Sequence, residues 1–274
     1  MDVIISDYMP DEPAHAHPSF ANVIRQRERV RQRLGAIRHK IGVYSAKGGV
    51  GKTTIAVNTA YALARQGFRV GLLDADIDCP NVTMFLGIKE MMGTGFPLKP
   101  VVRDGVKVAS TAMLIDELRR PIIWRGPIIT KMLGELLENT DWGELDYLVF
   151  DLPPGTSDAP LTIMQLLALD GFIIVTTPQR IASINSIRSG LMARRLNVPL
   201  LGVVENMAGE SPGANLAEVI SSLGTDLLAS VPLDPVFNTL SDSGKVPAIE
   251  DEKLSKIFRD LARRISGAVG VGEG

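Results

Sequence analysis

The sequence contains a single cysteine, Cys79, among its 274 residues. One thiol excludes an intramolecular disulfide framework and any metal site that needs four cysteines from one chain. No apolar run approaches the roughly 18 residues that a membrane span requires, so no transmembrane segment is expected. The amino terminus is acidic and interrupted by prolines, unlike a signal peptide with its basic start and apolar middle.

An excess of charge of one sign is also missing. The 29 lysine and arginine residues face 31 aspartate and glutamate residues, which leaves a formal net charge of −2. Such a balance gives no global reason to expect a nucleic-acid partner, and none is predicted. Hydrophobic residues make up 45% of the chain, which is typical of globular proteins and enough for a substantial core. Together these features predict a cytoplasmic globular protein.

Internal repeats, low-complexity linkers and breaks in composition are absent as well. The length suits one large domain or two small ones, and without a linker we expect a single domain over residues 41–267. Residues 1–20 contain three prolines and no periodicity, which predicts a flexible N-terminal arm. Residues 21–40 are arginine-rich with apolar residues at mostly three- and four-residue steps, which predicts a basic leading helix. Its basic face is either solvated or meets phosphate or an acidic partner. Residues 268–274 are expected to form a tail.

Short apolar runs of β-type residues alternate with stretches of helical composition over most of the chain. Runs that are apolar on both faces and separated by helices are typical of a parallel sheet covered on both sides. The right-handed crossover preference then predicts an α/β fold with an open, mostly parallel β-sheet flanked by helices on both faces. The expected strands are residues 41–44, 70–73, 106–109, 147–150, 172–176, 200–204 and, more weakly, 227–231. The expected helices are residues 53–65, 127–137, 159–167, 181–196 and 214–223.

A glycine-rich segment, residues 45–54, lies between the first predicted strand and the first predicted helix of this alternation. Its sequence is SAKGGVGKTT, and the strand–loop–helix context is typical of a phosphate-binding loop. Glycines let backbone N–H groups turn onto phosphate oxygens, and the helix N-terminus adds the positive end of its dipole. Lys52 is placed to reach the β- and γ-phosphates of ATP, and the Thr53 hydroxyl is placed to ligate Mg²⁺. The predicted nucleotide-binding residues of this loop are Gly48, Gly49, Val50, Gly51, Lys52, Thr53 and Thr54.

Two acidic motifs follow predicted strands. Asp74 and Asp76 come directly after the run at 70–73, and Asp151 ends the run at 147–150. Carboxylates at the carboxyl ends of parallel strands lie at the ligand edge of an open α/β sheet. An apolar strand that ends in aspartate is the Walker B arrangement, in which Asp151 holds a water bound to Mg²⁺. The Pro-Pro-Gly that follows predicts a turn suited to sensing the γ-phosphate.

The glycine-rich loop also contains a second lysine, Lys47, in the sequence KGGVGKT. This resembles the deviant phosphate-binding loop of the MinD/ParA group of P-loop ATPases, which includes the nitrogenase iron protein. The resemblance implies a homodimer that sandwiches two Mg·ATP, in which Lys47 of one chain touches the partner's nucleotide and supplies charge to the transition state. It also implies that Asp76 is the switch aspartate, which orients the attacking water or the magnesium shell with Asp74 as its support. The predicted catalytic residues are therefore Lys47, Asp76 and Asp151, and the predicted magnesium-site residues are Thr53, with Asp76 and Asp151 acting through water.

Further motifs resemble those of Mrp-type proteins, the iron–sulfur cluster carrier ATPases of this group. They are GLLDADI at 71–77, IWRGP at 123–127, DWGELDY at 141–147, the segment 151–158, VTTPQ at 175–179, VENM at 204–207, VPLDP at 231–235 and SDSGK at 241–245. The resemblance runs from about residue 33 to residue 264. It implies that Asn206 contacts the adenine base and that Pro232 belongs to a loop that closes over the base. Slow turnover is expected if dimer assembly limits the rate of ATP hydrolysis.

The sequence departs from the Mrp pattern at the cluster ligands. Mrp-type carriers usually have Cys-x-x-Cys shortly after the ENM motif, whereas residues 207–215 here contain no cysteine. A [4Fe–4S] cluster needs about four ligands, commonly thiolates, and a homodimer of this chain supplies only two, both Cys79. Cys79 lies near the predicted nucleotide rather than at the family's cluster position, and we interpret it as an inert turn residue. His15 and His17 are interpreted as part of the flexible arm rather than as a metal site.

Three hypotheses for the function follow. The first is a dimeric ATPase in iron–sulfur cluster assembly or transfer, with apo iron–sulfur proteins as partners, in which a cluster is held through other ligands or the role is accessory. The second is a nucleotide-switched positioning or scaffold ATPase of the MinD/ParA kind, without a cluster. The third, a small-molecule kinase or ligase, lacks a candidate acceptor site. The C-terminal stretch 254–265 is apolar at helical spacing with cations among the apolar residues, and we expect it to dock on the core rather than on anionic lipid.

Overall fold

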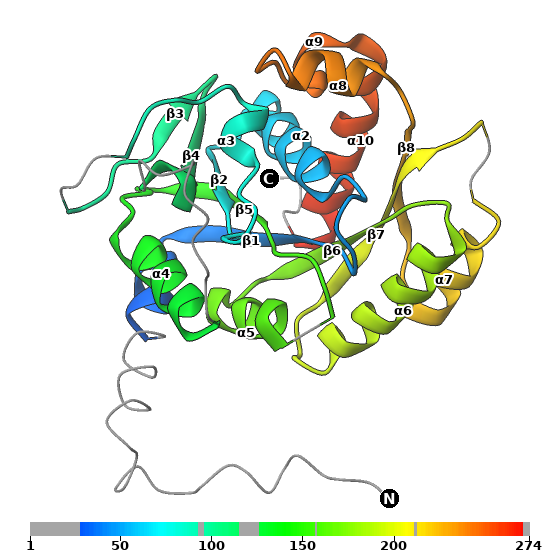
Figure 1. The fold of residues 1–274 in the computed structure, drawn as a ribbon, viewed down its shortest axis with the longest axis horizontal. Helices are drawn as coiled ribbons and strands as arrows, with labels where there is room; N and C mark the ends of the chain where they lie inside the picture. Colours follow the sequence, from blue (N-terminus) through cyan, green and yellow to red (C-terminus); the bar gives the residue numbers. More distant parts are fainter. Residues whose placement is uncertain (1–27, 93–95, 115–125, 157, 211–212, 271–274) are drawn as a thin grey trace, which may run out of the picture.

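An eight-stranded sheet forms the centre of the computed structural model, which describes residues 28–92, 96–114, 126–156, 158–210 and 213–270 (Figure 1). The strand order is β3-β4-β2-β5-β1-β6-β7-β8, and every neighbouring pair is parallel except the antiparallel pair β3–β4. The open, mostly parallel sheet predicted from the sequence is thereby confirmed. The strands are β1 Ile37–Tyr44, β2 Val70–Asp74, β3 Val101–Arg103, β4 Val106–Ser110, β5 Leu145–Asp151, β6 Gly171–Thr176, β7 Leu200–Ala208 and β8 Leu227–Pro232.

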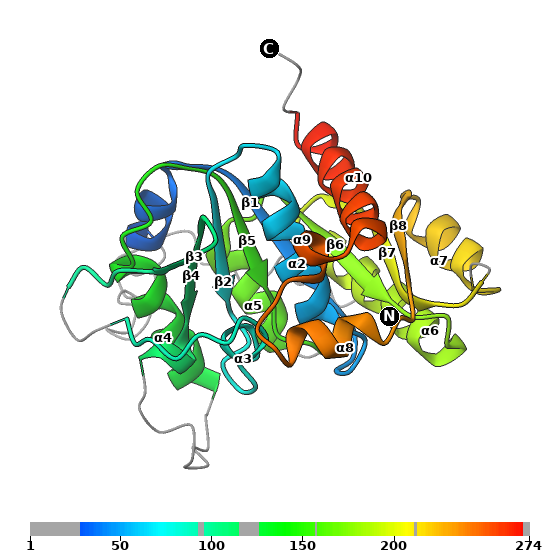
Figure 2. The same cartoon turned by 90° about the horizontal axis from the view of Figure 1, so that it is seen from above.

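Helices cover both faces of this sheet. Every residue of β2 and β6 is buried, because strands covered on both sides need apolar side chains on both sides. Helices α4 to α7 lie on one face, and α2 with α8 to α10 lies on the other (Figures 1 and 2). The helices are α2 Lys52–Arg65, α3 Val82–Phe85, α4 Gly126–Asn139, α5 Asp158–Leu167, α6 Arg180–Arg194, α7 Leu216–Leu223, α8 Val236–Ser241, α9 Pro247–Glu250 and α10 Glu252–Ala268, with a short 3-10 turn over Thr111–Met113.

The basic leading helix predicted over residues 21–40 is wrong at its C-terminal end. Helical residues within the described part of this segment are 28–34, and β1 already begins at Ile37. The helix ends in a turn at Gly35, whose N–H donates to the carbonyl of Gln32. Ile37 then pairs with Leu145 of β5. Ile37 fits the helical spacing of the preceding apolar residues, but pairing with β5 buries it in the sheet instead, and long-range pairing outweighs local periodicity.

The C-terminal helix α10 docks on the core, as predicted. Its apolar face, which includes Leu254, Phe258 and Leu261, is fully buried against β8 and α2. The Asp251 side chain caps the helix by accepting a hydrogen bond from the Leu254 N–H at 2.9 Å. The apolar residues that would enter a lipid surface are therefore already used in the fold. None of the described helices combines the length and the apolar character needed to cross a bilayer.

Several predicted features lie outside the described residues. They are the flexible arm over residues 1–20, with His15 and His17, and residues 271–274 of the tail. The IWRGP motif falls outside at residues 123–125. Strand β4 was predicted from its apolar run, whereas β3, its partner in the hairpin, was not predicted. The two-residue turn of the hairpin, Asp104-Gly105, has positive φ at both positions, which is the geometry of a type I′ hairpin turn.

The sheet brings together three strand ends that are far apart in the sequence. In the β-ladder, Asp151 at the end of β5 is opposite Val43 of β1 on one side and Asp74 of β2 on the other. The segments that follow β1, β2 and β5 therefore leave the sheet at one edge. In open α/β sheets this carboxyl-end edge is where ligands bind.

Candidate nucleotide-binding site

The glycine-rich loop follows β1 and leads directly into α2. Gly49 and Gly51 have φ values of 78° and 81°, a left-handed conformation that side chains other than glycine rarely adopt. Gly51 immediately precedes α2, and its carbonyl accepts the Ile55 N–H at 3.0 Å. A Cβ atom at Gly48 or Gly49 would meet no atom within 4 Å, so the loop borders open space. This arrangement leaves main-chain N–H groups free to surround an anion at the start of α2.

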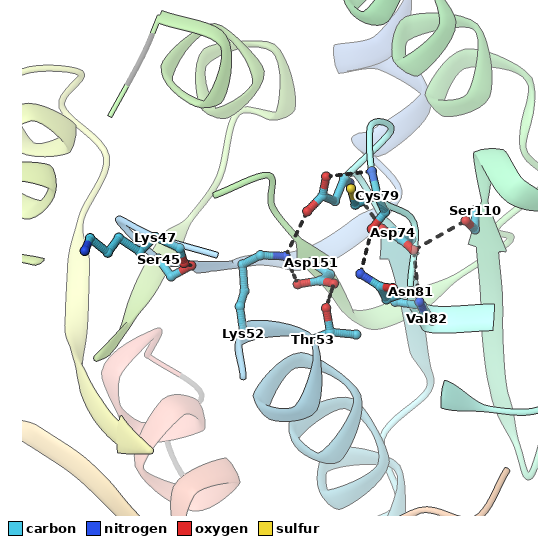
Figure 3. Close-up of polar contacts among 11 residues, drawn as sticks. Ser45, Lys47, Lys52, Thr53, Asp74, Cys79, Asn81, Val82, Ser110 and Asp151 are labelled. Atoms are coloured by element: carbon cyan, nitrogen blue, oxygen red, sulfur yellow. Dashed lines mark hydrogen bonds and ion pairs between the residues drawn. The ribbon is translucent and has the colours of Figure 1, made fainter. Parts of the chain in front are cut away.

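Lys52 lies at the centre of a buried polar cluster beneath this loop. Its Nζ atom is 2.5 Å from Asp151 Oδ1 and 3.6 Å from Asp76 Oδ2 (Figure 3). The Thr53 hydroxyl donates to Asp151 Oδ2 at 2.6 Å. Four of the predicted site residues, from three different segments, are thus in mutual contact. One lysine faces two carboxylates, so a further cation would be needed to balance their charge.

Asp74 stabilises the segment next to this cluster through hydrogen bonds to main-chain N–H groups. Its carboxylate accepts the N–H groups of Asp76 at 3.1 Å and Val82 at 3.0 Å, and Ser110 Oγ lies 3.5 Å away. Burial, followed by the nearby charge of Asp151, raises the pKa of Asp74 well above its usual range. Burial also raises the pKa of Asp76, although the charge of Lys52 opposes that shift. Asp74 therefore organises the turn that carries Asp76, as its predicted supporting role requires.

The turn after β5 is fastened to the phosphate-binding loop. The Tyr44 hydroxyl donates to the Gly155 carbonyl, and the Gly155 N–H donates to the carbonyl of Ser45 at 3.1 Å. The Leu152 N–H donates to the Val43 carbonyl at 3.0 Å. The sequence analysis assigned no role to Tyr44 or Ser45, and only their place beside the loop could have indicated one. These contacts connect the Pro-Pro-Gly turn directly to the glycine-rich loop.

Lys47 does not join the buried cluster. Its side chain is exposed and extends away from Lys52 and Asp151 (Figure 3). Among the described residues, the contact that fixes Lys47 involves its main chain, whose carbonyl accepts a hydrogen bond from the Ser45 hydroxyl at 2.8 Å. Within its own chain, Lys47 is therefore free to reach a group outside the cluster.

Asn206 contacts the glycine-rich loop from β7. Its Nδ2 atom donates to the Val50 carbonyl at 2.9 Å, and a Cβ atom added at Gly51 would lie 2.1 Å from the same nitrogen. Glycine is therefore required at position 51 for space as well as for conformation. Pro232 ends β8 opposite Ala208 of β7, at the same edge of the sheet but outside the Lys52 cluster.

Glu205 is a residue of the ENM motif to which the sequence analysis gave no role. It is buried, and its two carboxylate oxygens accept the Gly213 N–H at 2.8 Å and the Ser230 hydroxyl at 3.1 Å. Glu205 therefore holds the loop after β7 and the neighbouring strand β8 in place beside Asn206. Its position next to Asn206 was the signal available in the sequence.

The donor set suits Mg²⁺ better than an iron–sulfur cluster. The Thr53 hydroxyl and the Asp151 and Asp76 carboxylates are oxygen donors, and Mg²⁺ is typically held by one or two carboxylates together with phosphates and water. The described residues contain no group of three or more His, Cys, Asp or Glu side chains placed to hold a metal ion. Cys79 is exposed, and its N–H donates to Asp76 Oδ1 at 3.3 Å. The chain thus offers a cluster a single thiol, beside the nucleotide site.

Known proteins resemble this chain over most of its length. A family profile described as ParA: NUBPL iron-transfer P-loop NTPase matches residues 36–266. The iron–sulfur cluster carrier protein of Methanocaldococcus jannaschii is 39% identical over 264 residues, which span 90% of this chain and 91% of that protein. The iron–sulfur cluster carrier protein of Pseudomonas fragi is 41% identical over 251 residues, which span 84% of this chain and 85% of that protein.

Solved structures agree with this match. The nucleotide-binding protein of Archaeoglobus fulgidus in complex with ADP superposes with a TM-score of 0.72 at 34% identity, covering 84% of this chain and 96% of that chain. The cell-division ATPase MinD of Pyrococcus furiosus superposes with a TM-score of 0.68 at 21% identity, covering 84% and 99%, which shows a shared fold. The profile, the identity of the relatives and the geometry of the loop agree. This chain belongs to the NUBPL-type iron-transfer P-loop NTPases of the ParA group, a family of nucleotide-binding proteins.

Proposed function

We propose that this chain is a Mg²⁺-dependent ATPase of slow turnover that acts as a homodimer in cytoplasmic iron–sulfur cluster assembly or transfer, with apo iron–sulfur proteins as partners. The buried contact of Lys52 with Asp151 and Asp76, beneath an open glycine-rich loop, is the observation that carries the ATPase activity. The curated relatives named iron–sulfur cluster carrier proteins support the biological role.

The glycine-rich loop and Lys52 bind the phosphates in this proposal. Main-chain N–H groups of residues 48–53 surround the phosphate oxygens, and Lys52 exchanges part of its contact with Asp151 for the β- and γ-phosphates. Thr53, with Asp151 and Asp76 acting through water, would hold Mg²⁺, which when bound would neutralise charge on these phosphates. Asp76 orients the attacking water. Asn206, already in contact with the loop, recognises the adenine base beside Pro232.

Lys47 completes the site of the partner chain. Its exposed side chain points away from its own Lys52–Asp151 pair, which is the placement that a residue acting in trans needs. In the dimer its ammonium group stabilises negative charge that develops on the transferred phosphoryl group. Hydrolysis then removes the γ-phosphate, releases the turn fastened at Gly155 and loosens the dimer.

The two lysines give the first test. Lys52→Ala removes the residue that faces the phosphates, so nucleotide binding or hydrolysis should be lost. Lys47→Ala should leave nucleotide affinity within about twofold while hydrolysis and ATP-dependent dimerisation fall at least tenfold, since a trans interaction of this kind is worth several kcal/mol. Equilibrium binding, phosphate release and light scattering measure the three quantities. Unchanged turnover in Lys47→Ala contradicts the trans role, and unchanged turnover in Lys52→Ala contradicts the site.

Anaerobic reconstitution with iron and sulfide tests the biological role. We expect the purified dimer to bind iron or to accelerate delivery of a cluster to an apo iron–sulfur acceptor, in either case depending on ATP. Cys79→Ser shows whether the single thiol takes part, with the acceptor alone as the control. Neither iron binding nor any effect on the acceptor contradicts the carrier role. That result, with ATP-dependent dimerisation retained, identifies a MinD/ParA-like scaffold ATPase instead.

A further inference from the structure

Helix α6, Arg180–Arg194, has a buried face of small residues and an exposed face that includes large apolar residues. The residues that it buries are all small: Ala182, Ser183, Ser186, Ser189, Gly190 and Ala193. Three of its large apolar residues are instead exposed to solvent, with exposed fractions of 58% for Ile181, 39% for Ile184 and 45% for Leu191, whereas Ile187 is partly buried against the core. A surface helix normally buries its large apolar residues, so this face of α6 is not explained by the fold of one chain.

Close packing explains the small residues on the inner face. A Cβ atom at Gly190 would lie 2.6 Å from Leu223 Cδ2 of α7 and 2.8 Å from Ile174 Cδ1 of β6. The inner face of α6 must therefore be small so that the helix can lie close to the sheet and to α7. The fold sets no such limit on the outer face, and exposed apolar residues grouped there are a sign of a binding surface.

Arginines share the outer face with these apolar residues. Residues 181, 184, 188, 191 and 195 follow one another at steps of three and four, which places them on one side of the helix and its C-terminal end. The apolar members of this set are Ile181, Ile184 and Leu191, and the cationic members are Arg188 and Arg195. The side chains of Arg188 and Arg195 form no ion pair or hydrogen bond with the described residues. We call this set of five residues the α6 stripe.

We propose that the α6 stripe is a docking surface for an acidic amphipathic segment of a partner protein. Such a segment would place apolar side chains on Ile181, Ile184 and Leu191 and carboxylates on Arg188 and Arg195, as helix-in-groove recognition does with anchors one turn apart. Helix α6 begins just after β6, at the edge of the sheet that carries the phosphate-binding loop. This inference does not depend on the proposed function.

The distribution of charge favours an acidic protein segment over two other possible occupants, a second copy of this chain and a lipid surface. Helix α6 contains no aspartate or glutamate, so a symmetric contact between two copies of the stripe would bring arginine against arginine. On a lipid surface, an amphipathic helix needs its cations on the opposite side from its apolar residues. In the α6 stripe Arg188 lies between Ile184 and Leu191 instead. An acidic amphipathic protein segment covers the apolar residues with its own apolar side chains and pairs its carboxylates with the arginines.

A peptide display selection on the full chain tests this surface. A library of helical peptides is selected on the wild type and counter-selected on the double variant Ile184→Ser/Leu191→Ser, whose substitutions lie on the exposed face. We expect enriched peptides to carry net negative charge and apolar residues at steps of three and four. Absence of enrichment over the counter-selecting variant, or enrichment of neutral or basic peptides, overturns the proposal.

Titration with one enriched peptide then separates the occupants. Arg188→Glu/Arg195→Glu should weaken peptide binding at least tenfold, whereas the matched double charge reversal Lys256→Glu/Arg259→Glu on the exposed face of α10 should change it less than twofold. Equal binding to both variants overturns the proposal. Binding of phosphatidylglycerol vesicles to the wild type that is lost in Ile184→Ser/Leu191→Ser also overturns the proposal, because the α6 stripe would then bind lipid. ATP-dependent dimerisation lost in the same variant overturns it in favour of a second copy. The ATPase rate of each variant, expected to be unchanged, reports its folding.

Discussion

The side chain of His39 on β1 is expected to make the stability of the fold depend on pH. Its ring packs against Tyr147 of β5 with centroids 5.1 Å apart, and its Nε2 atom is buried without a hydrogen-bond partner among the described residues. Burial lowers the pKa of His39, with Asp170 opposing the shift and Arg38 adding to it. The imidazole is therefore held neutral in the folded chain at pH values where a free histidine begins to protonate.

Stability should consequently fall in mildly acidic solution. Above about pH 7 neither state binds the proton, but below the usual histidine pKa of about 6.5 the unfolded chain binds it first, which favours unfolding. His39→Phe keeps the contact with Tyr147 and removes the titration, so its loss of stability between pH 7 and pH 5.5 should be smaller. Because the ring is only partly buried, the difference should stay well below 1.4 kcal/mol per pH unit.

Urea denaturation of wild type and His39→Phe at both pH values measures this effect. The other two histidines, His15 and His17, are present in both proteins, so the comparison isolates His39. An identical loss of stability in the two proteins contradicts the assignment.

At the scale of elements, α2 is joined to α9 by Asn58. This side chain is fully buried, donates to the Thr54 carbonyl at 2.8 Å and accepts the Ala248 N–H at 2.7 Å. Asn58→Ala leaves a buried N–H group without a partner, which costs about 1–3 kcal/mol. Thermal or urea unfolding measures the loss. Asn139→Ala is the control, since Asn139 makes the same type of side-chain bond to a carbonyl four residues earlier but lies at an exposed site. Equal effects of the two substitutions would contradict this account.

Glu205 joins β7, the loop that follows it and β8. Removal of both acceptors in Glu205→Ala should release the Gly213 N–H and the Ser230 hydroxyl and destabilise the fold by about 1–3 kcal/mol. Glu205→Gln retains one acceptor for Gly213 and can donate to Ser230, so it should remain close to wild type. Hydrogen exchange at residues 213–216 should rise in the alanine variant alone. Equal exchange in the two variants would show that these bonds do not hold the loop.

Two departures from the predicted elements have the same origin. Ile37 continues the helical spacing of the preceding apolar residues, which extends the predicted helix over residues 37–40, and β3 is too short and too exposed to show an apolar run. Both become strands because a neighbour with free backbone groups is available, β5 in the first case and β4 in the second. The Asp104-Gly105 turn was a local hairpin signal that could have revealed β3.

At the scale of the whole molecule, α10 connects the end of the chain to the core. Phe258 is fully buried and meets Phe237 edge to face, with ring centroids 6.3 Å apart. Phe258→Ala should destabilise the protein by about 3–5 kcal/mol, through lost burial and an unfilled cavity. The urea midpoint should fall without a change in the slope of the unfolding transition, as for a single cooperative domain.

Val102→Ala provides the control for this substitution. Val102 lies on the edge strand β3 and is 63% exposed, so its truncation should change stability by less than about 0.5 kcal/mol. A separate early transition in Phe258→Ala, with the rest of the fold intact, would instead show that α10 is an independently unfolding part.

The α/β class, the glycine-rich loop and the candidate residues Lys52, Thr53, Asp76 and Asp151 could all be predicted from signals in the amino-acid sequence alone. These are local signals: strand-length apolar runs, glycines that only a tight anion-binding turn requires, and aspartates at strand ends. The sequence also contains a single cysteine, so each chain can supply an iron–sulfur cluster with at most one thiolate ligand.

Which of these residues come into contact, and how, depends on the order of the strands in the folded sheet. Asp151 contacts Lys52 across 99 positions of sequence, and this contact exists because β5 is inserted between β1 and β2 in the sheet. The role of Glu205 and the outward apolar face of α6 likewise depend on what packs around them. Periodicity shows that a helix has two faces, but burial by neighbouring elements decides which face is inside.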